Sequence, residues 1–478
     1  MKLFKGLCLI ALAIAFTIPV YAETQSIKLS GDLAVRYIGH ENYDFNSYNG
    51  DVADTDSSYF MTNAEAQLDA DLTDNVSVTL RMVNQHDWNV SDIGLGAPNH
   101  FDNDIHVGLA SPDDNYGEYD VLVDLAYVTL KEFFFTPLTV RIGKQDLWFG
   151  KGFIVGADYQ DPNGQIEADE FTSFTSFKAI RATWDFEPWT FDGVFAMIEE
   201  NEVQADDDEQ LYGINAACDL SEYNNAEAEV YYWFVKDDEI PNYIISKENR
   251  IHCLGARGSF DPHKDITLWG EGAVQLGTYV ANTVQTQPRE REAYAFDVGG
   301  ECRLWKEQYA WKPVVGTEYI FYSGQNEPTD RVGNSFHGWN RMFRGKVDSA
   351  IHEWYNVFYV NGMPTAPDNG GTNLHQIILM GSLEPMDNLK VDARYINFRL
   401  HETASMFTDN KDVGNEVDLE LNYEYTEDVT FGLLSAWFWS GDYYVIPEEE
   451  NIHPAFGTET LKHKQIASEV VATCKVSF

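Results

Sequence analysis

Basic residues are scarce in this chain. Its 478 residues include 32 Lys and Arg against 77 Asp and Glu, which gives a formal net charge of −45. A nucleic-acid partner would need a basic surface that neutralises phosphates, so this composition argues against that class of function. The same imbalance argues against docking on anionic lipid headgroups through basic patches.

Cysteines and long hydrophobic runs are also scarce. The mean hydropathy of −0.34 excludes a helical membrane protein, but a β-barrel hides its apolar half in every second residue. Four cysteines follow residue 22, and their spacing matches no zinc or haem motif. They are too few for a disulfide scaffold in a chain of this length. We expect them to be single strand residues that face lipid, with no disulfide indicated: Cys218, Cys253, Cys302 and Cys474.

The first 22 residues have the pattern of a signal peptide. Lys2 and Lys5 precede an apolar stretch at residues 7–20, and small residues permit cleavage after Ala22. No later stretch approaches the about 18 consecutive apolar residues of a transmembrane helix. We therefore expect a signal peptide at residues 1–22 and one exported domain at residues 23–478.

Residues 416–425 show a strict two-residue period. Apolar residues alternate there with residues that are almost all acidic. In a strand, successive side chains point to opposite faces, so one face would be apolar and the other acidic. A helix would spread both sets around its circumference, so the period predicts β-structure.

The same period recurs along the chain and predicts an all-β fold. Eighteen candidate strands are joined by connections that alternate strictly between nine long and eight short ones. This asymmetry is typical of an antiparallel transmembrane barrel with short periplasmic turns and long extracellular loops. A soluble β-helix or sandwich is the alternative. The predicted strands are 26–39, 59–72, 76–88, 119–132, 137–146, 173–187, 189–199, 209–220, 224–236, 250–261, 265–279, 291–305, 311–323, 373–385, 388–401, 414–426, 428–440 and 463–478.

The last predicted strand alternates toward a terminal aromatic residue. Val470, Ala472, Cys474 and Val476 share one face with Phe478. This ending resembles the signal read by the bacterial outer-membrane insertion machinery. The expected partners are therefore outer-membrane lipid and that machinery, and the expected location is the outer membrane of a Gram-negative-type bacterium.

Three stretches resemble the alginate-export family of outer-membrane barrels. The first runs from residue 124 through 140–146 to the Gly-rich 149–156. The second is 319–325 followed by 336–343, and the third is 414–421 continuing to 433–442. The resemblance implies an 18-stranded, porin-like barrel, in agreement with the count made from periodicity.

The parity of the strands predicts which charged residues line the pore. A charge on the lipid face would be costly, so the charged set must face inward. Over all the predicted strands, parity places fourteen acids and eight bases on the inner face, and this excess of acids would repel a polyanion and favour cations. The alternative is that acids and arginines form ion pairs that only brace the wall. The predicted pore-lining residues are Arg36, Glu65, Asp69, Arg81, Asp124, Arg141, Arg181, Arg257, Arg303, Arg394, Glu416 and Asp418.

Two predicted loops have unusual composition. Residues 199–209 are strongly acidic, and Asp206, Asp207, Asp208 and Glu209 are a weak candidate for Ca²⁺ without the spacing of a calcium loop. No other cofactor is expected. The longest loop, 324–372, contains basic residues and is expected to fold inward as a constriction or to cover the mouth: Arg341, Arg344 and Lys346, together with Trp339.

No catalytic motif is present, so an enzyme is not expected. The sequence predicts a channel that passes saccharides or small hydrophilic solutes through a charged lumen. One alternative is an exporter of an acidic exopolysaccharide such as alginate, working with periplasmic export partners. The other is a structural or conduit barrel that houses a partner protein.

Overall fold

The strands and parts of their connections make up the described structure. The computed structural model describes residues 26–42, 57–87, 121–135, 137–158, 176–199, 209–237, 249–280, 288–304, 310–325, 335–352, 371–403, 410–445 and 464–478. The predicted signal peptide at 1–22 lies outside these residues. So does the predicted calcium segment, except for Glu209 and the backbone of residue 199.

All eighteen predicted strands are confirmed, and their ends fall within about four residues of the predicted ones. In the described part of the chain, the only helices are two 3-10 turns, η1 (Phe133–Phe135) and η2 (Asp442–Tyr444). None of the described helices is long and apolar enough to cross a membrane. The strands are β1 (Ser26–Glu41), β2 (Ser57–Thr73), β3 (Val76–Asp87), β4 (Leu122–Leu130), β5 (Leu138–Gln145), β6 (Phe177–Phe186), β7 (Trp189–Glu199), β8 (Glu209–Leu220), β9 (Ala226–Asp237), β10 (Asn249–His263), β11 (Ile266–Tyr279), β12 (Arg289–Arg303), β13 (Val314–Tyr322), β14 (Leu374–Met386), β15 (Leu389–Leu400), β16 (Asp412–Thr426), β17 (Val429–Ser440) and β18 (Ile466–Ser477).

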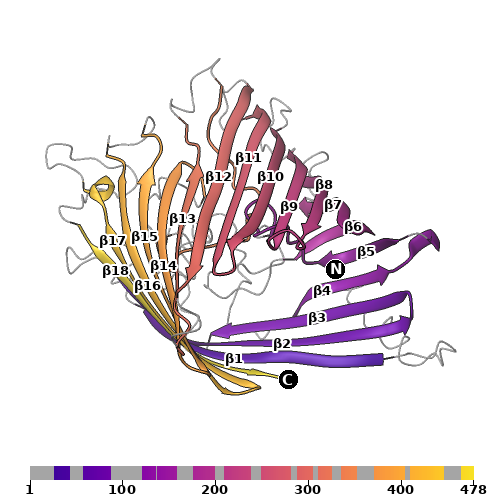
Figure 1. Ribbon diagram of the computed structural model, residues 1–478, viewed down its shortest axis with the longest axis horizontal. Coiled ribbons are helices and arrows are strands. Elements are labelled where there is room, and N and C mark those ends of the chain that lie inside the picture. Colours follow the sequence, from indigo (N-terminus) through magenta and orange to yellow (C-terminus); the bar gives the residue numbers. More distant parts are fainter. Residues whose placement is uncertain are drawn as a thin grey trace, which may run out of the picture.

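The sheet closes into a barrel (Figure 1). Each strand pairs antiparallel with the next along the chain, and β1 pairs with β18 in the same sense. At this seam, Gly31 and Phe478 exchange two backbone hydrogen bonds, of 3.0 and 2.9 Å. A closed ring leaves no strand edge, which is what a sheet needs in a medium without water to bond to its backbone.

The two faces of the barrel differ in chemistry. In β16, Glu416 and Asp418 are buried on the inner side, while the alternating Val417 and Leu419 point outward. The outer face exposes large apolar side chains along many strands, including Ile214, Leu254, Val274, Leu379 and Leu433. The alternation therefore follows the prediction of an apolar outer and a charged inner face.

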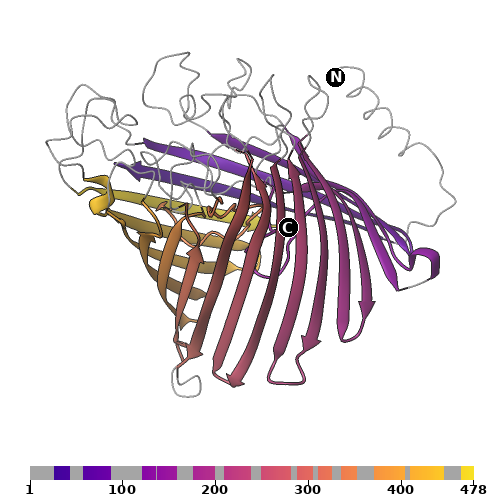
Figure 2. The ribbon, with the colours of Figure 1, turned by 90° about the horizontal axis from the view of Figure 1, so that it is seen from above.

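Short turns and long connections lie at opposite ends. The short turns of the magenta to orange-red strands lie toward the lower edge of Figure 2. We call this the turn end, and we call the other the loop end.

The four described cysteines are unpaired. The prediction that all four cysteines face lipid is wrong for Cys253. It is fully buried on the inner face of β10, in register with the inner residues Trp233 and Gln275. Parity places it inside, because Ile251 next to it on the same face is also buried while Leu254 is exposed.

A charge at mid-height on the outer face should destabilise the barrel. Leu379→Arg is expected to lower the free energy of unfolding in bilayers by about 2–4 kcal/mol, because the guanidinium must enter hydrocarbon. Ser382→Arg, on the inner face of the same strand, is the matched control and should change it far less. Equal losses in urea titrations of both variants would contradict the assignment of faces.

Candidate pore and its constriction

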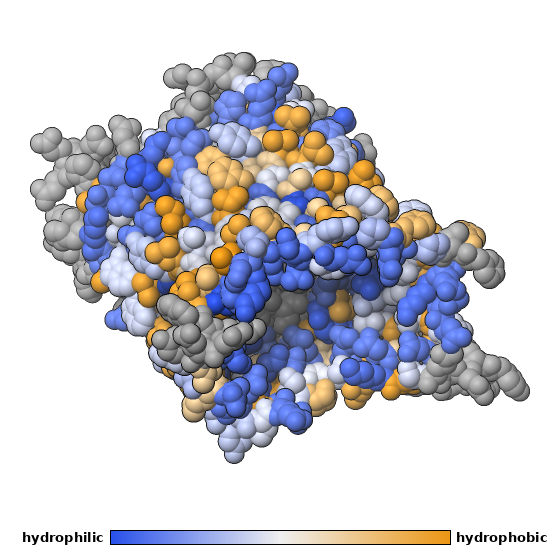
Figure 3. All heavy atoms as spheres, in the orientation of Figure 1, coloured by the Kyte–Doolittle hydropathy of each residue, from blue (hydrophilic) through white to orange (hydrophobic). Residues whose placement is uncertain are grey.

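Charged side chains line the inside of the barrel. In β6, for example, Ala179 is buried and Ile180 is exposed, so Arg181 and Ala179 share the inner face. The same parity places eleven of the twelve predicted pore residues on the inner face, and a β-bulge in β4 opposite Arg81 turns the twelfth, Asp124, inward, where it is buried. Figure 3 shows an opening of the barrel bordered by hydrophilic side chains. Whether each residue acts on a solute stays a prediction.

Two segments fold into this space. Residues 146–158 follow β5, and residues 335–352 lie between β13 and β14. The segments pair with each other, since Gly156 N donates to Phe343 O at 2.7 Å and Phe343 N donates to Ile154 O at 3.1 Å. The prediction that the longest loop folds inward is therefore confirmed for its described part.

Apolar side chains fix both segments against the inner wall. Phe153 stacks on Tyr322 of β13 at 5.6 Å, and Phe343 packs edge-on against Phe177 of β6 at 5.6 Å. All four side chains are buried. Burying each large side chain contributes on the order of 2 kcal/mol, so the segments are held as part of the barrel's core.

Behind the second segment, a row of acidic residues that we call the acid belt runs across strands β9 to β13 and consists of Glu229, Glu271, Asp297 and Glu318. Arg257 of β10 is in register with Glu229 and Glu271 on its two neighbours, and Glu271 is in register with Asp297 of β12. Glu318 of β13 extends the belt. Most of the belt therefore consists of carboxylates that are buried and need counter-charges.

Lys346 supplies such a counter-charge from the inserted segment. Its Nζ lies 2.8 Å from Asp297 Oδ2 and 2.6 Å from Glu318 Oε1. Burial alone would lower the pKa of Lys346, but the carboxylates of Asp348, Asp297 and Glu318 outweigh it and raise the pKa above its ordinary value. The side chain therefore stays charged and joins the segment to β12 and β13.

Lys151 is a second cation on an inserted segment. Its Nζ lies 3.5 Å from the ring centre of Trp269 in β11, within cation–π range. Burial lowers the pKa of Lys151, and the nearby carboxylate of Glu318 opposes that shift.

The end of the second segment is held by backbone donors. The N–H groups of Ile351 and His352 donate to the two carboxylate oxygens of Glu416, at 2.7 and 2.9 Å. The Ala350 N–H donates to Asp418 at 3.3 Å. Glu416 and Asp418, both predicted pore residues, therefore anchor the constriction.

Most predicted pore arginines have carboxylate partners. Arg81 Nε donates to Asp124 Oδ2 at 2.6 Å, and Ser176 donates to the other oxygen at 2.9 Å. Asp146 is the third acid near this pair, and burial is the main cause that raises its pKa. The other pairs are Arg181 with Asp192 at 2.8 Å, Arg257 with Glu227 and Glu229, and Arg303 with Glu301 at 2.7 Å.

The other predicted pore residues have different contacts. Arg394 donates to Asp348 O at 3.2 Å, so it holds the inserted segment. Asp69 accepts from Thr79 at 2.7 Å and from Gln67 at 2.8 Å. Two further predicted residues lie in register with inner-face neighbours: Arg36 with Met61 and Thr473, and Glu65 with Asp32 and Val83.

Arg141 differs from these arginines. It lies directly opposite Arg181 in the register of β5 and β6, and its guanidinium covers the ring of Tyr127 at 4.6 Å. No carboxylate in the described part of the chain forms an ion pair with it. Asp192 engages Arg181, so Arg141 carries the less compensated charge of the two.

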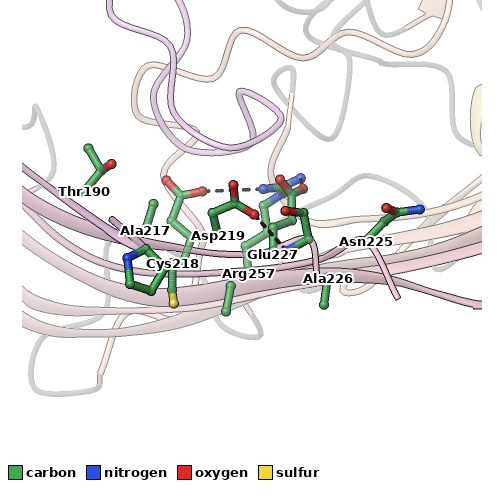
Figure 4. Close-up of a pocket in the computed structure, with 12 residues that line it drawn as sticks. Thr190, Ala217, Cys218, Asp219, Asn225, Ala226, Glu227 and Arg257 are labelled. Carbon is green, nitrogen blue, oxygen red and sulfur yellow. Dashed lines mark hydrogen bonds and ion pairs between the residues drawn. The ribbon is translucent and has the colours of Figure 1, made fainter. Parts of the chain in front are cut away.

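A cavity of about 340 Å³ lies at the turn end beside Arg257. Figure 4 shows Glu227, Asp219 and Arg257 on one side of the sheet, while the Cys218 sulfur points to the other. Thr190 also lines the cavity. Its lining combines charged and polar side chains with Pro188, Cys218 and several alanines.

Sequence reasoning did not single out Asp297, Lys151 or Trp148. Parity within β12 could have found Asp297, because it shares a face with Arg291 and Ala295. The other two lie on an irregular segment with no period. In the described part of the chain, no group of three or more metal-ligating side chains occurs, and the calcium candidates Asp206, Asp207 and Asp208 lie outside it.

Comparison with known proteins connects this architecture to one family. Residues 99–457 match the alginate export family. No curated protein matches the chain. Three solved Pseudomonas barrels share the fold at 9–10% sequence identity. Pseudomonas aeruginosa OccK11 (OpdR) matches with a TM-score of 0.52, covering 95% of this chain and 97% of that chain. The P. aeruginosa outer membrane protein opdK and a BenF-like porin from Pseudomonas fluorescens Pf-5 each match with a TM-score of 0.53, covering 95% of this chain and 100% of theirs.

Removing the Lys346 charge should loosen the constriction. Lys346→Met leaves Asp297 and Glu318 as adjacent buried carboxylates, so the segment is expected to detach from β12 and β13 and single-channel conductance to rise. Lys312→Met is the control, because Lys312 pairs with Glu384 on an exposed turn. Equal conductance of Lys346→Met and the unsubstituted barrel would contradict this role for the contact.

Proposed function

Because the chain belongs to the alginate export family, we propose that it is an outer-membrane channel for saccharides and other small hydrophilic solutes. The observation that carries this proposal is a lumen that is narrowed by two inserted segments and yet remains lined by compensated charges. No catalytic activity is part of the proposal.

Charge compensation favours neutral solutes. Arg81, Arg181 and Arg257 each face a carboxylate, so at these positions the wall offers hydrogen-bond donors and acceptors whose charges are paired. A saccharide carries many hydroxyl groups and no charge, and it can exchange its water contacts for such groups along the wall. Free ions would feel mainly the uncompensated residues.

Trp148 supplies an aromatic surface at the constriction. Its neighbours Leu147 and Phe149 are buried, but Trp148 itself is 51% exposed. Its indole N–H donates to Gly150 O at 3.2 Å, which fixes the ring. One face of a pyranose ring is largely C–H, so an exposed indole with polar groups nearby suits a sugar.

Export of an acidic polysaccharide is the second candidate function. The family itself supports it, and so does Arg141, whose charge faces the lumen beside Arg181. The carboxylates of the belt oppose it, because they would repel a polyuronate wherever they are not covered. Periplasmic export partners belong to this candidate. A conduit for a folded protein is disfavoured, because the inserted segments occupy space inside the barrel.

The orientation is part of the proposal. We place the turn end in the periplasm and the loop end outside the cell, with outer-membrane lipid around the strands and the insertion machinery as the assembly partner. The unequal connection lengths at the two ends support this orientation.

Sugar permeation should depend on Trp148. In liposome-swelling assays, the reconstituted barrel is expected to admit neutral mono- and disaccharides faster than oligouronates of equal length. Trp148→Ala should weaken block of single-channel current by disaccharides several-fold. Trp311→Ala, on the β12–β13 turn and similarly exposed at 48%, is the control. Faster uptake of oligouronates would favour the exporter instead.

Arg141 should influence ion selectivity. Arg141→Glu is expected to shift the reversal potential in a salt gradient toward cation selectivity, because it replaces a lumenal cation with an anion. Lys131→Glu reverses a charge on the exposed β4–β5 turn, where screening is stronger, and should shift it less. An unchanged reversal potential in Arg141→Glu would mean that Arg141 does not sense the permeation path.

A further inference from the structure

The first inserted segment begins with side chains that alternate between buried and exposed. Leu147 and Phe149 are buried, and Phe149 packs against Trp233 of β9 with ring centres 4.7 Å apart. Between and before them, Trp148 is 51% exposed, and the side chain of Asp146 is 48% exposed. The Cα atoms of residues two apart are separated by at most about 7 Å. Asp146 and Trp148 are therefore neighbours on the open side of this segment.

The indole of Trp148 lies where the two inserted segments meet. A Cβ atom added to Gly152 or to Gly345 would come within 2.6 Å of the indole ring, so the ring covers both glycines. Gly345 N also donates a hydrogen bond to Gly152 O at 2.8 Å, which joins the two segments at this point. The covered part of the ring is thus fixed on backbone. Because its N–H is already bonded to Gly150 O, a ligand would meet the exposed ring surface alone.

Arg81 of β3 positions the carboxylate of Asp146 without occupying it. The closest contacts of Arg81 are with Asp124, through Nη2 and through Nε at 2.6 Å. Its Nη2 lies 3.7 Å from Asp146 Oδ2, which is an ion-pair distance but too long for a hydrogen bond. Among the described residues, no group donates a hydrogen bond to Asp146. Both oxygens of this carboxylate can therefore accept hydrogen bonds from a ligand.

A neutral sugar complements both side chains. One face of a pyranose ring is largely C–H and suits the exposed indole. The hydroxyl groups at the edge of the ring can donate to the carboxylate, and hydrogen bonds to a charged acceptor are stronger than neutral ones. Since the two residues are at most about 7 Å apart along the chain, a single sugar unit can contact both.

The charges around Asp146 disfavour ligands that carry a charge of their own. A cation would meet Arg81 beside the carboxylate, and Arg141 is also near enough for its charge to act on Asp146. A uronate would bring its own carboxylate to that of Asp146, and like charges repel. A neutral ligand meets neither penalty.

We propose that Trp148 and Asp146 form a subsite for one neutral hexopyranose unit, with the sugar ring on the indole and its hydroxyl groups donating to the carboxylate. This inference rests on the proposed function, in which neutral saccharides enter the lumen. It adds the residue that selects among sugars. Asp146 favours a neutral unit through hydrogen bonds and disfavours an acidic unit through repulsion, at the point where the inserted segments narrow the lumen.

The test measures the block of single-channel current by maltose and by a diuronate at neutral pH, using the full-length barrel. Asp146→Ala is expected to raise the half-blocking concentration of maltose about tenfold, because the charged acceptor is lost. The same substitution should lower the half-blocking concentration of the diuronate, because the repelling charge is removed. Misfolding would weaken block by both sugars, so the opposite shifts identify a direct contact.

The matched control is Asp387→Ala, which removes an exposed acid from the β14–β15 turn and should change neither block. If neutral sugars permeate but Asp146→Ala shifts both blocks in the same direction, or shifts neither, the subsite is overturned and the proposed function stands. If maltose and smaller neutral sugars do not enter the unsubstituted barrel, both are overturned. Stronger block by an organic ammonium ion than by maltose would assign the site to cations and overturn the subsite.

Discussion

The structure depends on the hydrogen bonding of its backbone. Inside a bilayer no water is available, and each unpaired N–H or C=O group would cost several kcal/mol. The chain meets this constraint by pairing every strand with its neighbours and closing β1 on β18, where Gly31 and Phe478 complete the seam. Closure divides the side chains into an outer and an inner set, so every charged group of a strand must lie inside or near a rim.

That sorting creates a problem inside the barrel, because the acids greatly outnumber the bases. Buried carboxylates are stable only with counter-charges or hydrogen-bond donors. The two inserted segments provide both: Lys346 contacts Asp297 and Glu318, and backbone N–H groups contact Glu416. The inserted segments therefore neutralise part of the acidic wall, and the charges that hold these segments in place are the ones least available to a solute.

The sequence predicted the strands well and the constriction only in outline. Period-two alternation is a local property that appears in every strand, so eighteen strands and their faces could be read directly. Partners such as Lys346 and Glu318 lie far apart in the sequence and meet only after the barrel closes. Trp148 and Lys151 lie on an irregular segment where no period assigns a face. Cys253 was placed on the wrong face because its small apolar character outweighed the parity of its strand.

Net charge describes this chain poorly, because the barrel assigns most charged side chains of the strands to one of two environments, the inner wall and the rim of the outer face. Acids of the inner wall are compensated by arginines and by the inserted segments. Bases on the outer face are few, yet parity collects them at the loop end, where Lys236 faces Arg250 and Arg399 faces His375. A base at mid-height would cost about 2–4 kcal/mol, but the cost falls to about 0–1 near the interface. The hydrocarbon therefore permits outward-facing bases only at a rim of the barrel.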